Sequence, residues 1–485
     1  MKRDFARTLM PGEALWNIID LLPEVIEAPA RKRGGYSHES TAVSGASASS
    51  THLVDGIFAP FSSGDVMFAF DDAGFPYAFT TTGATAVTAA PLATRNPVFY
   101  NNYVIVPHSL GTTAPKKITA AAGSGASALG GSPPAGTYAV IYKDVLWLAA
   151  PAASADRIFF STAGNPEATW DTTNKYLDAS FPITGLAALQ NAVFVFGLAR
   201  TMRVRGSIPP PDSDFIVDDP IFDVGCTDNR SISLYRDKVI WGNSQGLYIS
   251  DGTALEDLTR LCGMKSWWQD IMNGDDGFST GTAYSVTGWS IATGVYGDWL
   301  VYSVLNGSTL VDSGMIDLTK YAWLRMSNIK TKRFIPRPYP QQLFFPRRDA
   351  AHPSMRVGGI SQFFYPATAN SADADGTAVL PLYETSFGLG DAHLKTIRRV
   401  FLTHDTRDPG SANPTQTISY IDSPEETSYT TIDTVAPETT EVTRVHRALN
   451  RPARGAAFKV AQTGASSDTR HYGLEAEVME REAMK

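Results

Sequence analysis

Cysteine is nearly absent from this chain, which holds only Cys226 and Cys262 among 485 residues. Domains that rely on disulfides in place of a large apolar core carry many more cysteines. A disulfide framework is therefore excluded as the basis of the fold. We expect both side chains to be buried small apolar residues of a protein made in a reducing compartment, while one disulfide between them remains an alternative.

The sequence also lacks long hydrophobic runs and an excess of basic charge. No stretch approaches the roughly 18 apolar residues that a membrane-spanning helix needs. The first seven residues do not form the apolar region of a signal peptide, so we expect a soluble, unexported protein with no membrane span. With 49 acidic and 41 basic residues, the net charge is −8, which argues against a general nucleic-acid-binding surface.

Catalytic and metal-binding motifs are missing as well. The eight histidines lack zinc-site spacing, and neither a nucleophile elbow nor a phosphate-binding or dinucleotide-binding loop occurs. Residues 371–382 superficially match a calcium loop but have Ser371 and Leu382 where acidic ligands belong. Three adjacent carboxylate pairs are interpreted as solvated turn residues: Asp71-Asp72, Asp218-Asp219 and Asp275-Asp276. We expect no enzyme activity, no cofactor and no metal.

Abundant instead are short alternating runs of β-branched and aromatic residues, joined in pairs by turn-forming residues. Such pairs start near residues 138, 185 and 230, with turns at Lys143-Asp144, Gln190-Asn191 and Arg236-Asp237. The unit recurs about every 45 residues, which is the length of a four-stranded propeller blade. The sequence therefore predicts an all-β fold whose residues 41–366 form a six- or seven-bladed β-propeller.

Three segments stand outside this repeat. Residues 1–40 are predicted to form an N-terminal arm with one short helix over residues 13–22, lying on the next domain or a neighbouring subunit. Residues 262–288 interrupt the blade period with a short helical or irregular insertion. Residues 367–485 have longer strands with one polar face, which predicts a separate C-terminal antiparallel β-sandwich.

Apolar and basic residues in the arm and the insertion are the candidate interface. The arm has an apolar face, the triplet that follows it is basic, and the insertion carries two adjacent tryptophans, which together would mark contacts between copies. For the triplet, a solvated arm with one or two ion pairs is the alternative to a phosphate or partner contact. The candidate residues are Trp16, Ile18, Ile19, Leu22, Arg31, Lys32, Arg33, Trp267 and Trp268.

Several phrases of the sequence resemble a propeller family of tailed-bacteriophage virion proteins. They include Trp16-Asn-Ile-Ile-Asp-Leu-Leu-Pro23 with Arg31-Lys-Arg-Gly-Gly-Tyr36, and Gly164-Asn-Pro-Glu-Ala-Thr-Trp170. Further similar phrases lie at residues 157–161, 183–189, 224–231, 246–252 and 395–400. The resemblance implies a structural protein of the tail nozzle or hub, made in the host cytoplasm. It also implies a homohexameric ring around the DNA-ejection conduit, next to other tail or portal-adaptor proteins.

The acidic balance suits such a conduit, because a negative lining repels the phosphate backbone and lets DNA slide past. The alternative function is a glycan-binding (receptor-recognising) or glycan-cleaving propeller of the virion that uses exposed tryptophans. Those tryptophans would be Trp267, Trp268 and Trp289.

Overall fold

The structure is a computed structural model. It describes most residues of the predicted propeller, and in the flanking regions it describes the strands. The described residues are 15–19, 21–23, 30–32, 53–71, 74–80, 83–87, 96–119, 125–206, 214–218, 220–273, 288–307, 309–326, 329–338, 342–346, 357–359, 382–388, 395–408, 415–421, 430–435, 443–453, 455–463 and 468–480.

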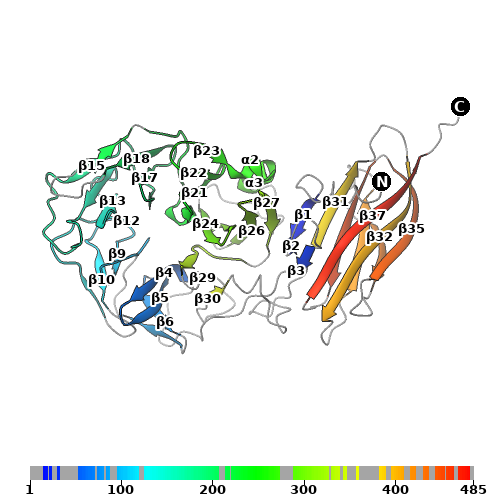
Figure 1. The fold of residues 1–485 in the computed structure, drawn as a ribbon, viewed down its shortest axis with the longest axis horizontal. Coiled ribbons are helices and arrows are strands. Elements are labelled where there is room, and N and C mark those ends of the chain that lie inside the picture. Colours follow the sequence, from blue (N-terminus) through cyan, green and yellow to red (C-terminus); the bar gives the residue numbers. More distant parts are fainter. Residues whose placement is uncertain are drawn as a thin grey trace.

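Among the described residues, seven antiparallel blades follow one another around a ring, which confirms the β-propeller (Figure 1). The first blade consists of β4 (Leu53–Phe61), β5 (Gly64–Asp71), β6 (Pro76–Thr80) and β7 (Gly83–Ala86). The second consists of β8 (Val98–Tyr100), β9 (Tyr103–Val106), β10 (Lys116–Ile118) and β11 (Ala126–Ala128). The third consists of β12 (Tyr138–Tyr142), β13 (Val145–Ala149), β14 (Arg157–Phe160) and β15 (Tyr176–Asp178). The fourth and fifth are β16 (Gly185–Ala188), β17 (Val193–Phe196), β18 (Thr201–Arg205) and β19 (Ile216–Val217), then β20 (Ser233–Tyr235), β21 (Lys238–Asn243), β22 (Gly246–Ser250) and β23 (Leu255–Asp257). The sixth is β24 (Trp289–Tyr296), β25 (Trp299–Asn306), β26 (Thr309–Asp317) and β27 (Ala322–Arg325), and the seventh has the described strands β28 (Ile335–Arg337), β29 (Gln342–Pro346) and β30 (Val357–Gly359).

Turn residues with positive φ set the strand pairing in several blades. Asn101 (φ 51) and Asn102 (φ 61) join β8 to β9, and Lys143 (φ 50) and Asp144 (φ 58) join β12 to β13. Two consecutive residues in this conformation form the tight hairpin turn whose twist matches that of the flanking strands. The turns expected at these positions from the sequence are confirmed.

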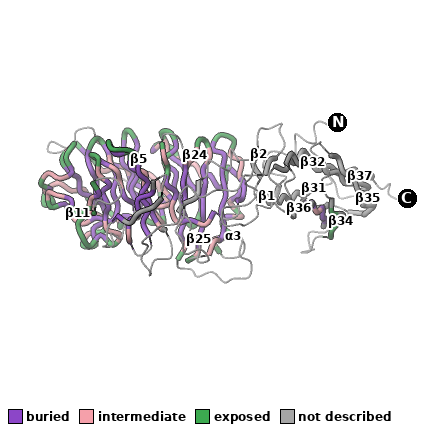
Figure 2. The backbone as a smooth tube through the Cα atoms, turned by 90° about the horizontal axis from the view of Figure 1, so that it is seen from below, coloured by how far each residue is buried: buried purple, intermediate pink, exposed green. Residues whose placement is uncertain are grey.

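The ring closes where the seventh blade meets the first. Strand β28 contacts β4, although β4 opens the propeller and β28 begins its last blade. Edge-on, the blade strands are mostly buried, and the exposed residues gather along the two rims of the disc (Figure 2). Aromatic side chains fill the spaces between the blades, including the fully buried Trp147 and Trp241. Burial of each such ring stabilises the fold by about 2–3 kcal/mol.

The insertion after the fifth blade contains a helix in its described part. Helix α2 (Leu258–Leu261) follows β23, and α3 (Lys265–Asn273) packs against the fifth and sixth blades. No helix among the described residues has the length and hydropathy required to cross a bilayer. Residues 265–273 of the insertion are thus helical, and its residues 274–287 lie outside the described part.

The described part of the N-terminal arm consists of three short strands, so the predicted helix over residues 13–22 is wrong. Strand β1 (Leu15–Ile19) pairs in parallel with β27 of the sixth blade through Ile19 and Arg325, and in antiparallel fashion with β31 (Leu382–Gly388). The physical reason is that this short run is too apolar for a free amphipathic helix, whereas two open strand edges offer its backbone hydrogen-bonding partners.

The C-terminal region contains two antiparallel sheets, as expected for a sandwich (Figure 1). One sheet continues from β1 through β31, β36 (Gly455–Thr463), β33 (Thr415–Ile421) and β34 (Thr430–Val435). The other has the order β2 (Leu21–Pro23), β3 (Ala30–Lys32), β37 (Asp468–Glu480), β32 (Lys395–Asp408) and β35 (Thr443–Ala453). The arm therefore contributes strands to both sheets of the sandwich.

Both cysteines are buried and free, which confirms the expectation of small apolar residues and excludes the disulfide alternative. Burial raises the pKa of each thiol to about 12. Neither thiol is therefore a reactive nucleophile at neutral pH.

Candidate functional site

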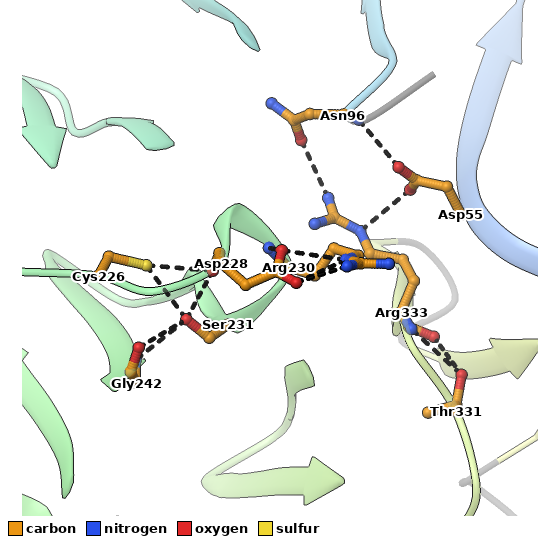
Figure 3. Close-up of polar contacts among 9 residues, drawn as sticks. All are labelled: Asp55, Asn96, Cys226, Asp228, Arg230, Ser231, Gly242, Thr331 and Arg333. Carbon is orange, nitrogen blue, oxygen red and sulfur yellow. Dashed lines mark hydrogen bonds and ion pairs between the residues drawn. The ribbon is translucent and has the colours of Figure 1, made fainter. Parts of the chain in front are cut away.

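Three polar side chains near the propeller axis link the first, second and last blades (Figure 3). Asp55 lies in β4, Asn96 precedes β8, and Arg333 precedes β28. Arg333 Nε lies 3.5 Å from Asp55 Oδ1, and Arg333 Nη2 donates to Asn96 Oδ1 at 3.1 Å. The backbone N–H of Asn96 donates to Asp55 Oδ2 at 2.9 Å. We name this trio the axial clasp, because it joins the two ends of the ring.

Burial dominates the electrostatics of the axial clasp. The Asp55 side chain is 2% exposed, and burial raises the pKa of its carboxyl above the ordinary value. The Arg333 charge and the backbone N–H groups of Gly56 and Asn96 oppose this rise. Because a buried ion pair is costly to break once one partner is gone, each of these groups depends on the others to remain inside the ring.

A second ion pair lies beside the clasp at the short helix η1 (Asn229–Ser231) of the fifth blade (Figure 3). Asp228 caps this helix, accepting from the backbone N–H of Arg230 at 3.0 Å and from the Arg230 guanidinium. Although burial favours the neutral guanidine, Asp228 raises the pKa of Arg230, and Asp55 adds to this effect. Two arginines and two aspartates therefore meet near the axis, so their formal charges cancel.

Neighbouring blades are joined around this centre by further hydrogen bonds. The side-chain oxygen of Asn229 accepts from the backbone N–H of Leu186 at 3.0 Å, which links the fifth blade to the fourth. Thr293 Oγ1 in the sixth blade donates to the backbone oxygen of Ser231 at 2.8 Å. The residues around the axial clasp and η1 thus provide hydrogen-bond partners for polar groups of most blades. These bonds fix the blades relative to one another.

The chemistry available at the centre is structural. A general acid or base needs access to a substrate, whereas Asp55 is enclosed and paired with Arg333. The described residues contain no group of three or more His, Cys, Asp or Glu side chains that could hold a metal ion.

In each of two carboxylate pairs that the sequence predicts to be solvated, the structure describes one member, and that member is held by hydrogen bonds or ion pairs. Asp71 is buried and accepts a hydrogen bond from Tyr77 Oη at 2.9 Å. The prediction that Asp71 is a solvated turn residue is therefore wrong. Asp218 binds Arg203 Nε at 2.8 Å and Arg205 Nε at 2.7 Å, so it too is held by partners. The bonds from Arg205 and then Arg203 lower the pKa of Asp218. Their neighbours Asp72 and Asp219, the pair Asp275-Asp276, and residues 371–381 lie outside the described part.

The insertion tryptophans are not a shared exposed patch. Trp268 is fully buried and donates from Nε1 to the backbone oxygen of Asn243 at 3.1 Å. Trp267 is half-buried and donates from Nε1 to Asp312 Oδ2 at 3.2 Å. The expectation that both rings are exposed is therefore wrong for Trp268, because α3 turns that ring into the core of the chain's own blades.

Trp267 belongs to a second buried polar group, the blade-six cluster of Trp267, Tyr302, Asp312 and Arg325. Arg325 Nε lies 3.1 Å from Asp312 Oδ1, and its guanidinium lies 4.3 Å from the centre of the Trp267 ring. Tyr302 Oη donates to Asp312 Oδ2 at 2.8 Å. Burial raises the pKa of Asp312, while the Arg325 charge opposes the rise. The cluster joins α3 to the outer strands of the sixth blade.

The arm residues are placed by backbone pairing within this chain. Ile18 and Ile19 pair with Tyr383 and Leu382 of β31, and Trp16 lies at the irregularity in that pairing. In the second sheet, the register aligns Leu22 with Arg31, Leu21 with Lys32, and Arg31 also with Arg470 of β37. Arg33 lies outside the described residues. The structure thus brings the arm candidates to the propeller–sandwich junction, and a contact with another copy stays a prediction.

Neither Asp55 nor Asp312 belongs to a motif that the sequence predicts to be functional. Each is an acid inside an otherwise apolar strand run, Leu53-Val-Asp-Gly-Ile-Phe58 and Thr309-Leu-Val-Asp-Ser-Gly-Met315. A charged residue at such a position indicates a buried ion pair. The sequence offers no signal for which arginine supplies the partner.

No family model matches this sequence, and no curated protein matches it. Three solved structures with similar folds are each 11% identical to this chain. BamB from Moraxella catarrhalis has a TM-score of 0.36 and the match covers 70% of this chain and 93% of BamB, whereas BBS1N in complex with ARL6DN has a TM-score of 0.40 with 67% and 97% covered. A puromycin hydrolase mutant has a TM-score of 0.34, and the match covers 70% of this chain and 60% of the hydrolase. At these identities and TM-scores, no functional argument is drawn from them.

Proposed function

We propose that this chain is a structural protein of a tailed-bacteriophage virion, a tail nozzle or hub subunit that forms part of the DNA-ejection conduit. The observation that carries the proposal is the path of the N-terminal arm. Strand β1 lies between β27 of the propeller and β31 of the sandwich, so one sheet runs from the sixth blade into the sandwich. Such a junction suits a building block whose two domains must keep a fixed arrangement under mechanical load.

The polar groups of the described blades agree with a structural role. Asp55, Asp218 and Asp312 are each paired with arginine, and these bonds hold strands or blades together. An enzyme instead keeps a titratable group poised beside an accessible substrate site. The other parts of the proposal rest on the sequence phrases that resemble tail propeller proteins. These parts are the location in the tail, the ring of copies, the contact with neighbouring tail proteins and the passage of DNA.

The proposal is tested by labelling purified tailed particles with a gold-conjugated antibody raised against the full chain. We expect label confined to the tail, and loss of that label when the antibody is first absorbed with the purified chain. Particles that carry no specific label, or label on the capsid alone, would contradict the proposal.

A matched functional test uses particles grown without this chain. An early stop codon in its gene should yield DNA-filled heads that lack the corresponding part of the tail and do not eject DNA. Supplying the intact chain in trans should restore both the structure and infectivity. Complete, infectious particles in the absence of the chain would overturn the assignment.

A further inference from the structure

A pocket of about 450 Å³ opens where strands and turns of the fifth, sixth and seventh blades meet. The fifth blade supplies Leu234, Tyr235 and Arg236; the sixth supplies Val295, Gly297 and Asp298; and the seventh supplies Pro336, Arg337, Pro338 and Gln342. This volume lies within the range of roughly 300–1,000 Å³ that is typical of small-molecule sites. The pocket is separate from the axial clasp and from the arm.

Local contacts hold its charged groups in place before any ligand arrives. Asp298 Oδ1 accepts from Tyr235 Oη at 2.7 Å and from Arg236 Nη2 at 2.9 Å. The bond from Tyr235 and then that from Arg236 lower the pKa of Asp298, so its carboxylate is ionised at neutral pH. The Arg236 guanidinium lies 5.0 Å from the centre of the Tyr235 ring. Pre-organised groups of this kind reduce the entropic cost of binding.

Arg337 also lines the pocket and is likewise anchored. It donates from Nη1 to Gln342 Oε1 at 3.2 Å and from Nη2 to Asp65 Oδ2 at 3.0 Å, and it lies 4.9 Å from the centre of the Phe58 ring.

Each guanidinium of the lining has a carboxylate partner, Asp298 for Arg236 and Asp65 for Arg337, so these four charges balance and the lining offers N–H donors without a net charge. Arg236 has five N–H donors, and its side chain is 65% exposed. The N–H groups of Arg236 that do not bond to Asp298 can donate to an anionic ligand. Beside these charges lie apolar surfaces, including Leu234, which is 51% exposed, and the two prolines.

We propose that this pocket binds an acidic sugar, a hexuronic acid or a similar carboxylated monosaccharide. Arg236 and Arg337 face the sugar carboxylate, since planar guanidinium groups bind carboxylates well. Asp298 accepts from a ring hydroxyl and Gln342 donates to another, while Leu234 and Pro336 contact the apolar face of the ring. This inference goes beyond the proposed tail function, because the site is complete within one chain.

The test is isothermal titration of the full chain with methyl glucuronide, with methyl glucoside and acetate as separate arms. We expect a dissociation constant on the order of 1 mM for the glucuronide and at least about tenfold weaker binding of both controls, the size of one lost charge-assisted contact. Equal binding of the glucoside would overturn the role of the carboxylate. Equal binding of acetate would overturn the role of the sugar ring.

A variant pair assigns the site. Arg236→Gln removes the exposed guanidinium of the pocket, and Arg200→Gln is its control, because Arg200 is 59% exposed in the fourth blade and does not line the pocket. We expect Arg236→Gln to weaken glucuronide binding at least about tenfold and Arg200→Gln to leave it unchanged. Binding that is absent in the unmodified chain, or equal in both variants, would overturn the proposal, and either result leaves the tail assignment separately testable.

Discussion

The axial clasp and the blade-six cluster are both built on a buried Asp–Arg pair, but the two pairs join different parts of the chain. In the clasp, Arg333 bonds to Asn96 across 237 positions of sequence and pairs with Asp55 of the first blade. In the blade-six cluster, Arg325 and Asp312 stand only 13 positions apart on neighbouring strands. The first pair therefore closes the ring, whereas the second stabilises one blade, its helix α3 and the strand that receives the arm.

This difference teaches that similar chemistry can have global or local consequences. Opening the clasp separates the first and last blades and exposes the core between them. Disrupting the blade-six cluster leaves the ring closed and affects the outer strands, to which β1 is attached. The four predictions below test this distinction, beginning with the largest expected effect.

Asp55→Ala should lower the free energy of unfolding of the propeller by about 3–5 kcal/mol, because Arg333 is left as a buried charge without its carboxylate. Two backbone N–H donors, those of Gly56 and Asn96, also lose their acceptor. Chemical denaturation measures the change. Hydrogen exchange should rise in β4 and β28 together, and a loss smaller than about 1 kcal/mol would contradict the closing role of the clasp.

Arg325→Met should cost about 2–3 kcal/mol, because Asp312 keeps its bonds to Tyr302 and Trp267 after the guanidinium is lost. Hydrogen exchange should rise in β1 and α3, since Arg325 contacts the Trp267 ring and its backbone pairs with Ile19. Protection in β4 and β28 serves as the internal control and should stay unchanged. Equal loss of protection in all four segments would remove the distinction between the two pairs.

The turns and hairpins of the propeller could be predicted from the sequence, because local residue chemistry determines them. Lys143 and Asp144 adopt the turn conformation that their residue types favour, and Tyr100 of the second blade then bonds to Asp144. The conformation of the arm cannot be predicted from the sequence, because residues 13–22 are apolar enough for either helix or strand and the choice depends on the edges of β27 and β31. The clasp could not be assembled from the sequence either, since its partners meet only after seven blades have closed.

Asp218→Asn should cost about 1–2 kcal/mol at pH 7, when the carboxylate accepts from Arg203 and Arg205. The lowered pKa of Asp218 means that its contribution is present above the ordinary value of 3.8 and is lost as the pH falls below that value toward the folded-state pKa. The difference between the two proteins should therefore shrink below pH 4. If the difference in free energy of unfolding between the two proteins instead grows as the pH falls, the lowered pKa of Asp218 cannot be its cause.

Arg236→Gln should change the free energy of unfolding by less than about 0.5 kcal/mol, because its ion pair with Asp298 lies at the surface. The 2.9 Å bond is well formed, yet both side chains are largely exposed. Thermal denaturation at low and high salt provides the measurement. A larger loss would show that this pair shares the structural role of the two buried pairs.

A reconstruction of the assembled phage tail at side-chain resolution tests the central claim most directly. We predict density for this chain as a ring of copies around the DNA channel, with β1 of each copy between its own β27 and β31 and with the axial clasp closed. A tail that lacks this chain, or one in which its propeller stands apart from a sandwich that β1 does not join, would contradict the account.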